Sequence, residues 1–149
     1  MFSWGDFTQV NVMNYQLWYQ PCHMPGAVAT LLSLVDDPDS AVRRAAIHSL
    51  GRVGDSSVAT AVLARAEDED PETRAAAVAA LCRLGVDEMR EGVRAALVDP
   101  AEKVRVAGVA GAALLGADAL LLLADALRED STEVRTEAAA VLGSLGDLR

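Results

Sequence analysis

The side chains able to do chemistry in this sequence are few, and the densest group is the run PCHMPG near the N-terminus. His23 lies there between Cys22 and Met24. Imidazole, thiolate and thioether together suit copper or zinc. Three adjacent residues cannot all face one ion from regular structure, however, and no second cluster supplies the missing ligands. The sequence therefore predicts no metal site, and the prolines and glycine of the run predict a turn.

Three further candidates for a catalytic or metal-binding role each have a simpler structural interpretation. His48 has no nucleophile at a recognisable spacing and is interpreted as a solvated side chain. Cys82 is expected to be a small packed residue and not a reactive thiol. The acidic run EDEDPE, residues 67–72, lacks the spacing and the turn glycine of a calcium loop, and predicts a turn followed by acids at a helix N-terminus. We therefore expect no catalytic residue and no cofactor.

Composition and charge exclude several classes of partner. The chain has 149 residues, of which 52% are hydrophobic, and this is ample for a core. Its formal net charge of −9 repels a phosphate backbone, so we expect no nucleic-acid partner. The apolar run AGVAGAALLGADALLLLADAL is interrupted by Gly116, Asp118 and Asp125, which predicts no membrane helix. Two thiols and no signal-peptide pattern predict a cytoplasmic protein with reduced cysteines.

The elements that position these side chains come from an internal repeat. A stretch typified by DPDSAVRRAAIHSLGRVG, residues 37–54, occurs four times in the chain. The copies align on four arginines that are 31, 31 and 30 residues apart: Arg43, Arg74, Arg105 and Arg135. A fixed period of about 30 residues is the signature of a solenoid, in which each unit contacts only its neighbours.

Each copy has the pattern of an amphipathic helix. Counted from the arginine, the third, fourth, seventh and tenth residues are small or apolar in every copy, and these positions form one stripe of an α-helix. The eleventh residue is always glycine, at which a helix can end in a left-handed conformation. These glycines are Gly54, Gly85, Gly116 and Gly146. We therefore expect four helices that each end at this glycine.

A helix-forming segment precedes each copy, so the repeating unit is a helical hairpin. Three of these segments follow an aspartate able to cap a helix: Asp55, Asp87 and Asp118. The predicted hairpins are residues 27–54, 55–85, 86–116 and 117–146. Stacked in order, they bury one continuous apolar core. The predicted fold is an all-α, right-handed α-α superhelix that occupies residues 27–149.

The pattern Asp-x-x-x-x-Val-Arg followed by Ala, Leu and Gly resembles the HEAT repeat, especially the short bacterial form also found in phycobilisome bilin lyase subunits. The resemblance covers residues 27–146, although Thr73 replaces the usual valine and the fourth turn is one residue shorter. It implies an inter-repeat ladder of hydrogen bonds between turn aspartates and second-helix arginines. The implied pairs are Asp37 with Arg43, Asp68 with Arg74, Asp99 with Arg105, and Asp130 or Glu129 with Arg135.

The same resemblance implies a function. HEAT-like repeats imply a rigid curved surface whose concave side is lined by the second helices, so the expected function is a non-catalytic scaffold or adaptor that binds a partner protein. The alternative is a role similar to that of bilin lyase subunits, which handle a tetrapyrrole or its acceptor protein. The repeat is shared by scaffolds, adaptors and a few lyase subunits, and so it does not name the partner.

Residues 1–26 have no repeat register and form a separate N-terminal extension. All six aromatic residues of the chain lie there: Phe2, Trp4, Phe7, Tyr15, Trp18 and Tyr19. Large amphipathic aromatic side chains dominate interface energetics. The leading hypothesis is that this segment caps the first repeat, which would otherwise expose an apolar face. The alternatives are that it lies in the concave groove or docks on a partner protein.

The opposite end of the array has only DLR after Gly146. Leu142 and Leu145 are therefore expected to be partly exposed unless a partner or a second copy packs on them. This predicts a dimer or a larger assembly.

The third copy carries no charge from Val106 to Ala117 and contains three glycines, which are poor helix formers: Gly108, Gly111 and Gly116. One explanation is the close approach of a backbone, from a neighbouring helix or a ligand segment. The other explanation, left open by the sequence, is tolerated drift in a buried helix.

Overall fold

The computed structural model describes residues 26–146, and within this range the protein contains only helices, turns and loops. The helices pair as α2 (Ala27–Leu34) with α3 (Ser40–Val53), α4 (Ala59–Ala64) with α5 (Pro71–Leu84), α6 (Glu88–Leu97) with α7 (Glu102–Ala112), and α8 (Ala119–Ala126) with α9 (Thr132–Gly146). Three short 3-10 helices accompany them: η1 (Ser56–Val58), η2 (Arg65–Glu67) and η3 (Ala113–Asp118).

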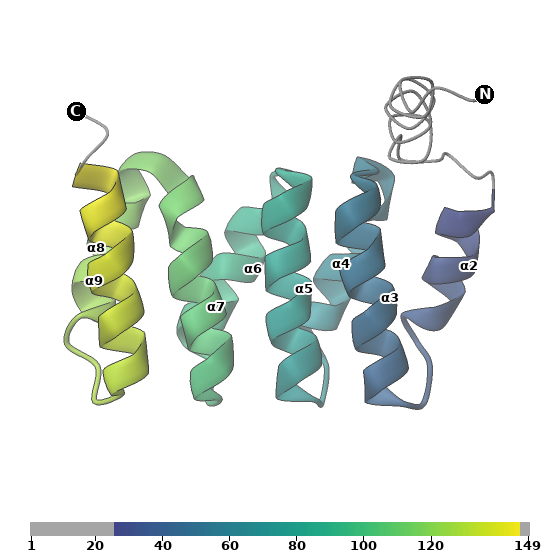
Figure 1. Ribbon diagram of the computed structural model, residues 1–149, viewed down its shortest axis with the longest axis horizontal. Helices are drawn as coiled ribbons and strands as arrows, with labels where there is room; N and C mark the ends of the chain where they lie inside the picture. Colours follow the sequence, from purple (N-terminus) through teal and green to yellow (C-terminus); the bar gives the residue numbers. More distant parts are fainter. Residues whose placement is uncertain (1–25, 147–149) are drawn as a thin grey trace, which may run out of the picture.

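The hairpins stand side by side in sequence order (Figure 1). The second helices α3, α5, α7 and α9 form one row, and the first helices of the later hairpins lie behind them. α2 lies at one end of the stack, and α8 with α9 lies at the other. The expected all-α, HEAT-like solenoid is therefore confirmed. No helix in the described range combines the length and the apolar character needed to cross a bilayer.

Short polar signals set the ends of the second helices. Asp39 caps α3 by accepting a hydrogen bond from the Ala41 backbone N–H, and Asp70 caps α5 by accepting one from the Thr73 N–H. Gly54 and Gly85 end α3 and α5 with φ angles of 75° and 64°. The two glycines thus act as left-handed C-caps, as their position predicts.

The predicted apolar stripe faces the core. All four residues at the third position after the arginine are buried: Ala46, Ala77, Gly108 and Ala138. At the fourth position Ile47, Val78 and Val109 are buried, whereas Ala139 in the last helix is exposed. The helices α3, α5 and α7 therefore bury this stripe against their neighbours. In α9 part of the stripe lacks such cover among the described residues.

Two local predictions are wrong and one holds only in part. α7 ends at Ala112 and its last turn is the 3-10 helix η3, but the helical path does break at Gly116, which has a φ of 65° and a ψ of −127°. Gly146 is still part of α9 and has no positive φ. Asp87 has helical backbone angles and its side chain makes no capping bond, although Asp55 does accept the Ser57 N–H as expected.

Glycines in the second helices allow neighbouring helices to approach closely. A Cβ on Gly108 would lie 3.0 Å from the Leu97 backbone nitrogen in α6, and one on Gly111 would lie 2.8 Å from the Cys82 sulfur in α5. Of the two explanations for these glycines, the structure supports close approach by neighbouring helices. Gly116 is different because a Cβ there would meet nothing within 4 Å, and its role is the turn.

Candidate functional site

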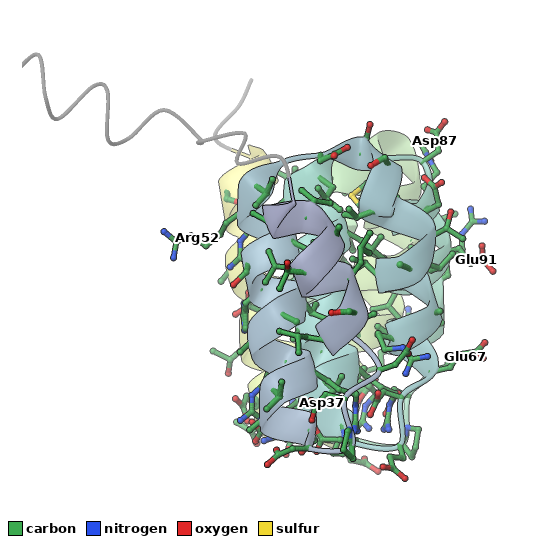
Figure 2. The ribbon with its side chains drawn as sticks, turned by 90° about the vertical axis from the view of Figure 1, so that its right-hand side faces the viewer. Asp37, Arg52, Glu67, Asp87 and Glu91 are labelled. Carbon is green, nitrogen blue, oxygen red and sulfur yellow. The ribbon has the colours of Figure 1, made fainter. Side chains whose placement is uncertain are left out.

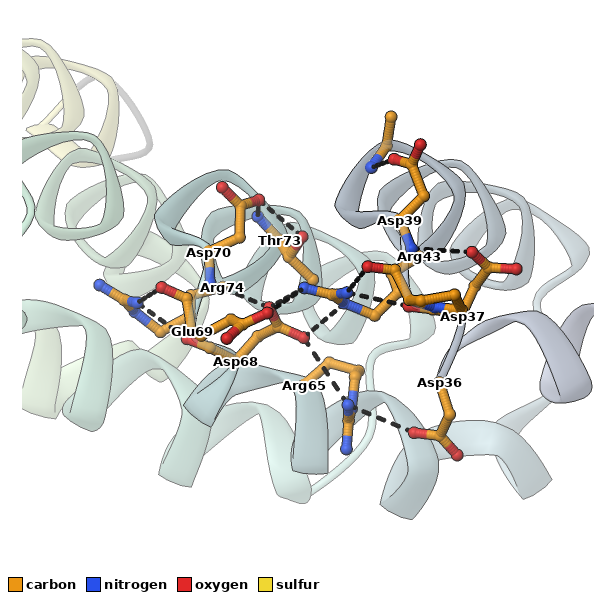
Figure 3. Close-up of polar contacts among 12 residues, drawn as sticks. Asp36, Asp37, Asp39, Arg43, Arg65, Asp68, Glu69, Asp70, Thr73 and Arg74 are labelled. Atoms are coloured by element: carbon orange, nitrogen blue, oxygen red, sulfur yellow. Dashed lines mark hydrogen bonds and ion pairs between the residues drawn. The ribbon is translucent and has the colours of Figure 1, made fainter.

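The inter-repeat ladder is a row of hydrogen bonds that joins successive turns of the stack (Figure 3). Arg43 in α3 donates from Nε and Nη2 to the two carboxylate oxygens of Asp68, at 2.9 and 2.7 Å. Its Nη1 donates to the Asp37 carbonyl oxygen at 2.9 Å. A planar guanidinium is suited to such a two-pronged bond because its donors form a rigid fork. Arg43 therefore ties the turn of its own hairpin to the turn of the next.

The same arrangement recurs along the stack. Arg74 donates to both oxygens of Asp99, at 2.7 and 2.8 Å, and to the Asp68 carbonyl oxygen. Arg105 donates from Nε to the Glu129 carboxylate at 2.9 Å. A glutamate thus takes the place of the aspartate in the shortened fourth turn.

The structure places the carboxylate partner one hairpin further along than the within-copy pairs suggest. The aspartate of an arginine's own turn contributes its backbone carbonyl, and the carboxylate comes from the following turn. Asp130 likewise contributes its carbonyl oxygen to Arg135, at 2.7 Å. The predicted within-copy pairs are therefore joined only through backbone carbonyl oxygens, and the pairing of their side chains was wrong.

Burial and hydrogen bonding oppose each other at the ladder carboxylates. Burial alone would raise the pKa of Asp68, but bonds from Arg43 and from the Asp70 N–H outweigh it and hold that pKa below its usual value. The hydrogen bond from Arg74 lowers the pKa of Asp99. Both carboxylates are therefore held in the charged form.

An acidic recess lies beside the first rung of the ladder. Its volume is about 530 Å³, and its lining includes Asp36, Asp68 and Arg65. Arg65 Nη1 pairs with both Asp36 and Asp68, at 3.2 and 3.6 Å. Among the described residues no group of three or more His, Cys, Asp or Glu side chains is arranged to hold a metal ion. The recess belongs to the ladder, since Arg43 and Arg65 in its lining already pair with Asp68.

A second network crosses the exposed face of the second helices. Glu72 in α5 accepts from Arg44 in α3 at 2.9 Å and also from Lys103 in α7. The Lys103 bond lowers the pKa of Glu72. Three successive hairpins are thus joined on this face by one carboxylate and two cations.

Between these side chains the face is hollowed. The hollow has a volume of about 270 Å³ and lies across α3, α5 and α7. Its lining residues are Arg44, His48, Glu72, Ala75, Ala76, Ala79 and Lys103. The alanines make a floor without long side chains, so an extended chain segment can approach it closely.

The rim of the hollow is basic in an acidic protein. Arg83 Nη1 lies 3.5 Å from His48 Nδ1, which adds a third cation beside Arg44 and Lys103. Viewed along the stack, Arg52 projects on the second-helix side, whereas Glu67, Asp87 and Glu91 project on the other side (Figure 2). We name this surface the second-helix hollow and define it by its lining residues together with Arg83.

The other side chains singled out by the sequence are placed as follows. His48 is exposed at the edge of the second-helix hollow. Cys82 is half-buried, and burial raises the pKa of its thiol. Cys22, His23 and Met24 lie outside the described residues, as do the six aromatic residues of the N-terminal extension.

The C-terminal end of the stack exposes more apolar side chains than those expected. Leu142 and Leu145 are half-buried against the core, which agrees with the expected partial exposure. The large apolar side chains that are exposed near this end are Leu114, Leu120, Leu121 and Leu127. Leu121 is 75% exposed. For Leu120, Leu121 and Leu127 the sequence signal was the run ALLLLADAL, in which too many leucines follow one another for a single buried stripe.

The fold and the ladder define an all-α solenoid of HEAT-like helical hairpins. A family model described as HEAT repeats matches residues 20–82, which include the first hairpin, most of the second, and the ladder residues Arg43, Asp68 and Arg74. A comparison with curated proteins gives no match. The likeness to bilin lyase subunits therefore stays a resemblance of the repeat pattern.

Proposed function

We propose that the protein is a non-catalytic protein-interaction module that binds an extended acidic segment of a partner protein in the second-helix hollow. The observation that carries this proposal is the combination of an alanine floor with three cations at the rim. HEAT repeats are in general protein-interaction scaffolds, which supports the coarser part of the proposal.

The charges of the hollow favour an acidic partner. Arg44 and Lys103 share the single carboxylate of Glu72, and Arg83 adjoins the edge at His48, so the rim has more positive than negative charge. An incoming carboxylate would find guanidinium donors, which make strong charge-assisted bonds. This electrostatic attraction mainly raises the association rate and the specificity of binding, and salt weakens it.

A short acidic peptide suits this surface better than a nucleic acid does. Double-stranded DNA carries one charge per about 1.7 Å of its axis, so it would extend from the hollow onto the acidic remainder of a protein with net charge −9. A peptide can confine its charges to the rim. No observation in the described residues favours the bilin-lyase-like alternative, which stays a sequence-based prediction.

The test is a titration of the full chain with a fluorescently labelled peptide that alternates Glu and Ala, read by fluorescence anisotropy. The double variant Arg44→Glu/Lys103→Glu is expected to bind about tenfold or more weakly, since each reversal removes a surface attraction and adds a repulsion. The matched control Arg90→Glu/Arg128→Glu makes the same charge change on two exposed residues outside the hollow, one in α6 and one in the turn after α8. Equal losses in both variants would show that only net charge matters and would refute the proposed site.

A further inference from the structure

The ladder has two unfinished ends, one at each end of the stack. Asp37 lies in the first turn, at the end marked by α2, and Arg135 lies in α9 at the opposite end (Figure 1). Among the described residues, no arginine from a preceding hairpin reaches the Asp37 carboxylate. Within residues 26–146, no carboxylate from a following hairpin reaches Arg135. One end therefore offers a carboxylate acceptor and the other a guanidinium donor, and their charges are complementary.

The free acceptor is held in the orientation that binds arginine elsewhere in the ladder. The Asp39 N–H donates to Asp37 Oδ1 at 2.9 Å. The corresponding bonds to Asp68 and Asp99 come from the backbone N–H two residues on, at 3.0 and 2.8 Å, and both of these carboxylates accept a guanidinium. In Figure 3 the Asp37 carboxylate lies at the end of the row, turned away from Arg43.

The donor at the other end is held equally well. Arg135 Nη1 donates to the carbonyl oxygens of Glu129 and Asp130, both at 2.7 Å. These are the residues six and five positions before it, and Arg43, Arg74 and Arg105 use the same two positions. Nη2 of Arg135 has only the Thr132 hydroxyl, at 3.2 Å. In Arg43 and Arg74 the Nε and Nη2 atoms bind the carboxylate of the next turn.

The packing surfaces beside these groups also match. Within the stack, Gly51 of α3 faces Ala80 of α5, and Cys82 of α5 faces Gly111 of α7. In the repeat register Gly143 of α9 corresponds to Gly51 and Cys82, and a Cβ there would meet nothing within 4 Å. On the opposite side, Ser49 of α3 corresponds to Ala80 and Gly111, and it is also small and half-buried. A further hairpin can therefore approach α9 as closely as the others approach one another.

We propose that the partner at these ends is a second copy of this chain, stacked head to tail so that Arg135 of one copy donates to the Asp37 carboxylate of the next. The contact buries the exposed Ala139 face of α9, whose counterparts Ile47, Val78 and Val109 are buried. A contact between two different faces closes into a ring or continues as a filament. This inference rests on the ladder and not on the second-helix hollow.

The test is sedimentation velocity of the full chain over about a hundredfold range of concentration, at about 0.15 M salt so that the repulsion between acidic copies is screened. The average mass of the wild-type protein is expected to rise with concentration. Arg135→Glu and Asp37→Arg are each expected to weaken association at least about tenfold. An equimolar mixture of the two variants is expected to restore it, because every interface then again pairs an arginine with a carboxylate.

Controls separate this contact from general effects of charge and folding. Arg128→Glu changes the charge at the same end on a side chain outside the ladder and is expected to leave association unchanged. The milder variants Arg135→Gln and Asp37→Asn, checked for helicity by circular dichroism, replace any reversal variant that fails to fold. A wild-type protein that stays monomeric at every concentration would assign these ends to some other partner and overturn the proposal. Failure of the mixed variants to reassociate would also overturn it.

Discussion

The most informative test of the stacking is the isosteric substitution Asp68→Asn. The Arg43 and Asp68 side chains are only 6% and 3% exposed, and two charge-assisted bonds join them. The asparagine keeps the shape of the residue and one acceptor oxygen but turns an amide donor toward a guanidinium donor. Arg43 then stays buried with its charge balanced only by Glu69, 3.5 Å away on an exposed side chain.

The expected size of the effect follows from burial. Removing one partner of a buried ion pair costs about 3–5 kcal/mol, because the remaining charge is left uncompensated. The acceptor oxygen that asparagine retains recovers roughly 1 kcal/mol of this. We therefore expect Asp68→Asn to lower the free energy of unfolding by about 2–4 kcal/mol.

The matched control is Glu129→Gln at the other end of the ladder. The Arg105 and Glu129 side chains are 20% and 27% exposed, so water partly solvates both charges. The expected cost is about 1 kcal/mol or less, as for exposed ion pairs. Asp99→Asn, whose pair is 14% and 10% exposed, should fall between the two.

The assay is urea unfolding followed by far-UV circular dichroism, with the midpoint and the slope compared among the three variants. A common slope is needed before midpoints are converted to free energies, because solenoids can lose repeats one after another. Equal losses at the three pairs, within about 0.5 kcal/mol, would refute the argument that burial sets the strength of each rung.

Three further predictions follow from the same contacts. Asp70→Ala should lower the unfolding free energy by about 1–2 kcal/mol through loss of the α5 cap. Asp87→Ala should have little effect because Asp87 makes no capping bond. Urea unfolding measures both. Gly51→Ala should destabilise the fold, since its Cβ would lie 2.9 Å from a backbone carbon of α5, and Gly143→Ala should raise the melting temperature, with up to about 1 kcal/mol from helix propensity. The ladder aspartates Asp68 and Asp99 have lowered pKa values in the folded state. Their stabilisation is therefore present above the unfolded pKa of about 3.9 and is lost as pH falls through the folded value. Asp99→Asn should flatten this acid dependence in urea titrations at several pH values.

Helices and their stacking were predictable from sequence because the signals are local. A stripe at offsets three, four, seven and ten needs only the geometry of one helix, and Gly54 and Gly85 mark helix ends by their own backbone freedom. The prediction was least exact in the third copy. There α7 already ends at Ala112 and the last turn is the 3-10 helix η3, although Gly116 still breaks the helical path.

The ladder geometry could not be predicted from one copy. In the first three copies the motif places an aspartate six residues before the arginine, and that spacing is satisfied by the carbonyl oxygen. The carboxylate partner lies 25 residues further on, at a position set by the offset between stacked hairpins. The second-helix hollow was missed for a related reason: Ala75 and Ala79 lie off the core stripe, and their role as a floor depends on α3 and α7 standing on either side.

The exposure of the ladder pairs rises steadily from the first rung to the third, and this gradient bears on how the molecule associates. Charge pairs weaken as water reaches them, so coupling between neighbouring hairpins is strongest between α3 and α5 and weakest toward α9. The leucines exposed on α8 lie at the weakly coupled end. The proposed second copy stacked on α9 would exclude water from Arg135, which has no carboxylate partner within residues 26–146, so this rung would gain most from association.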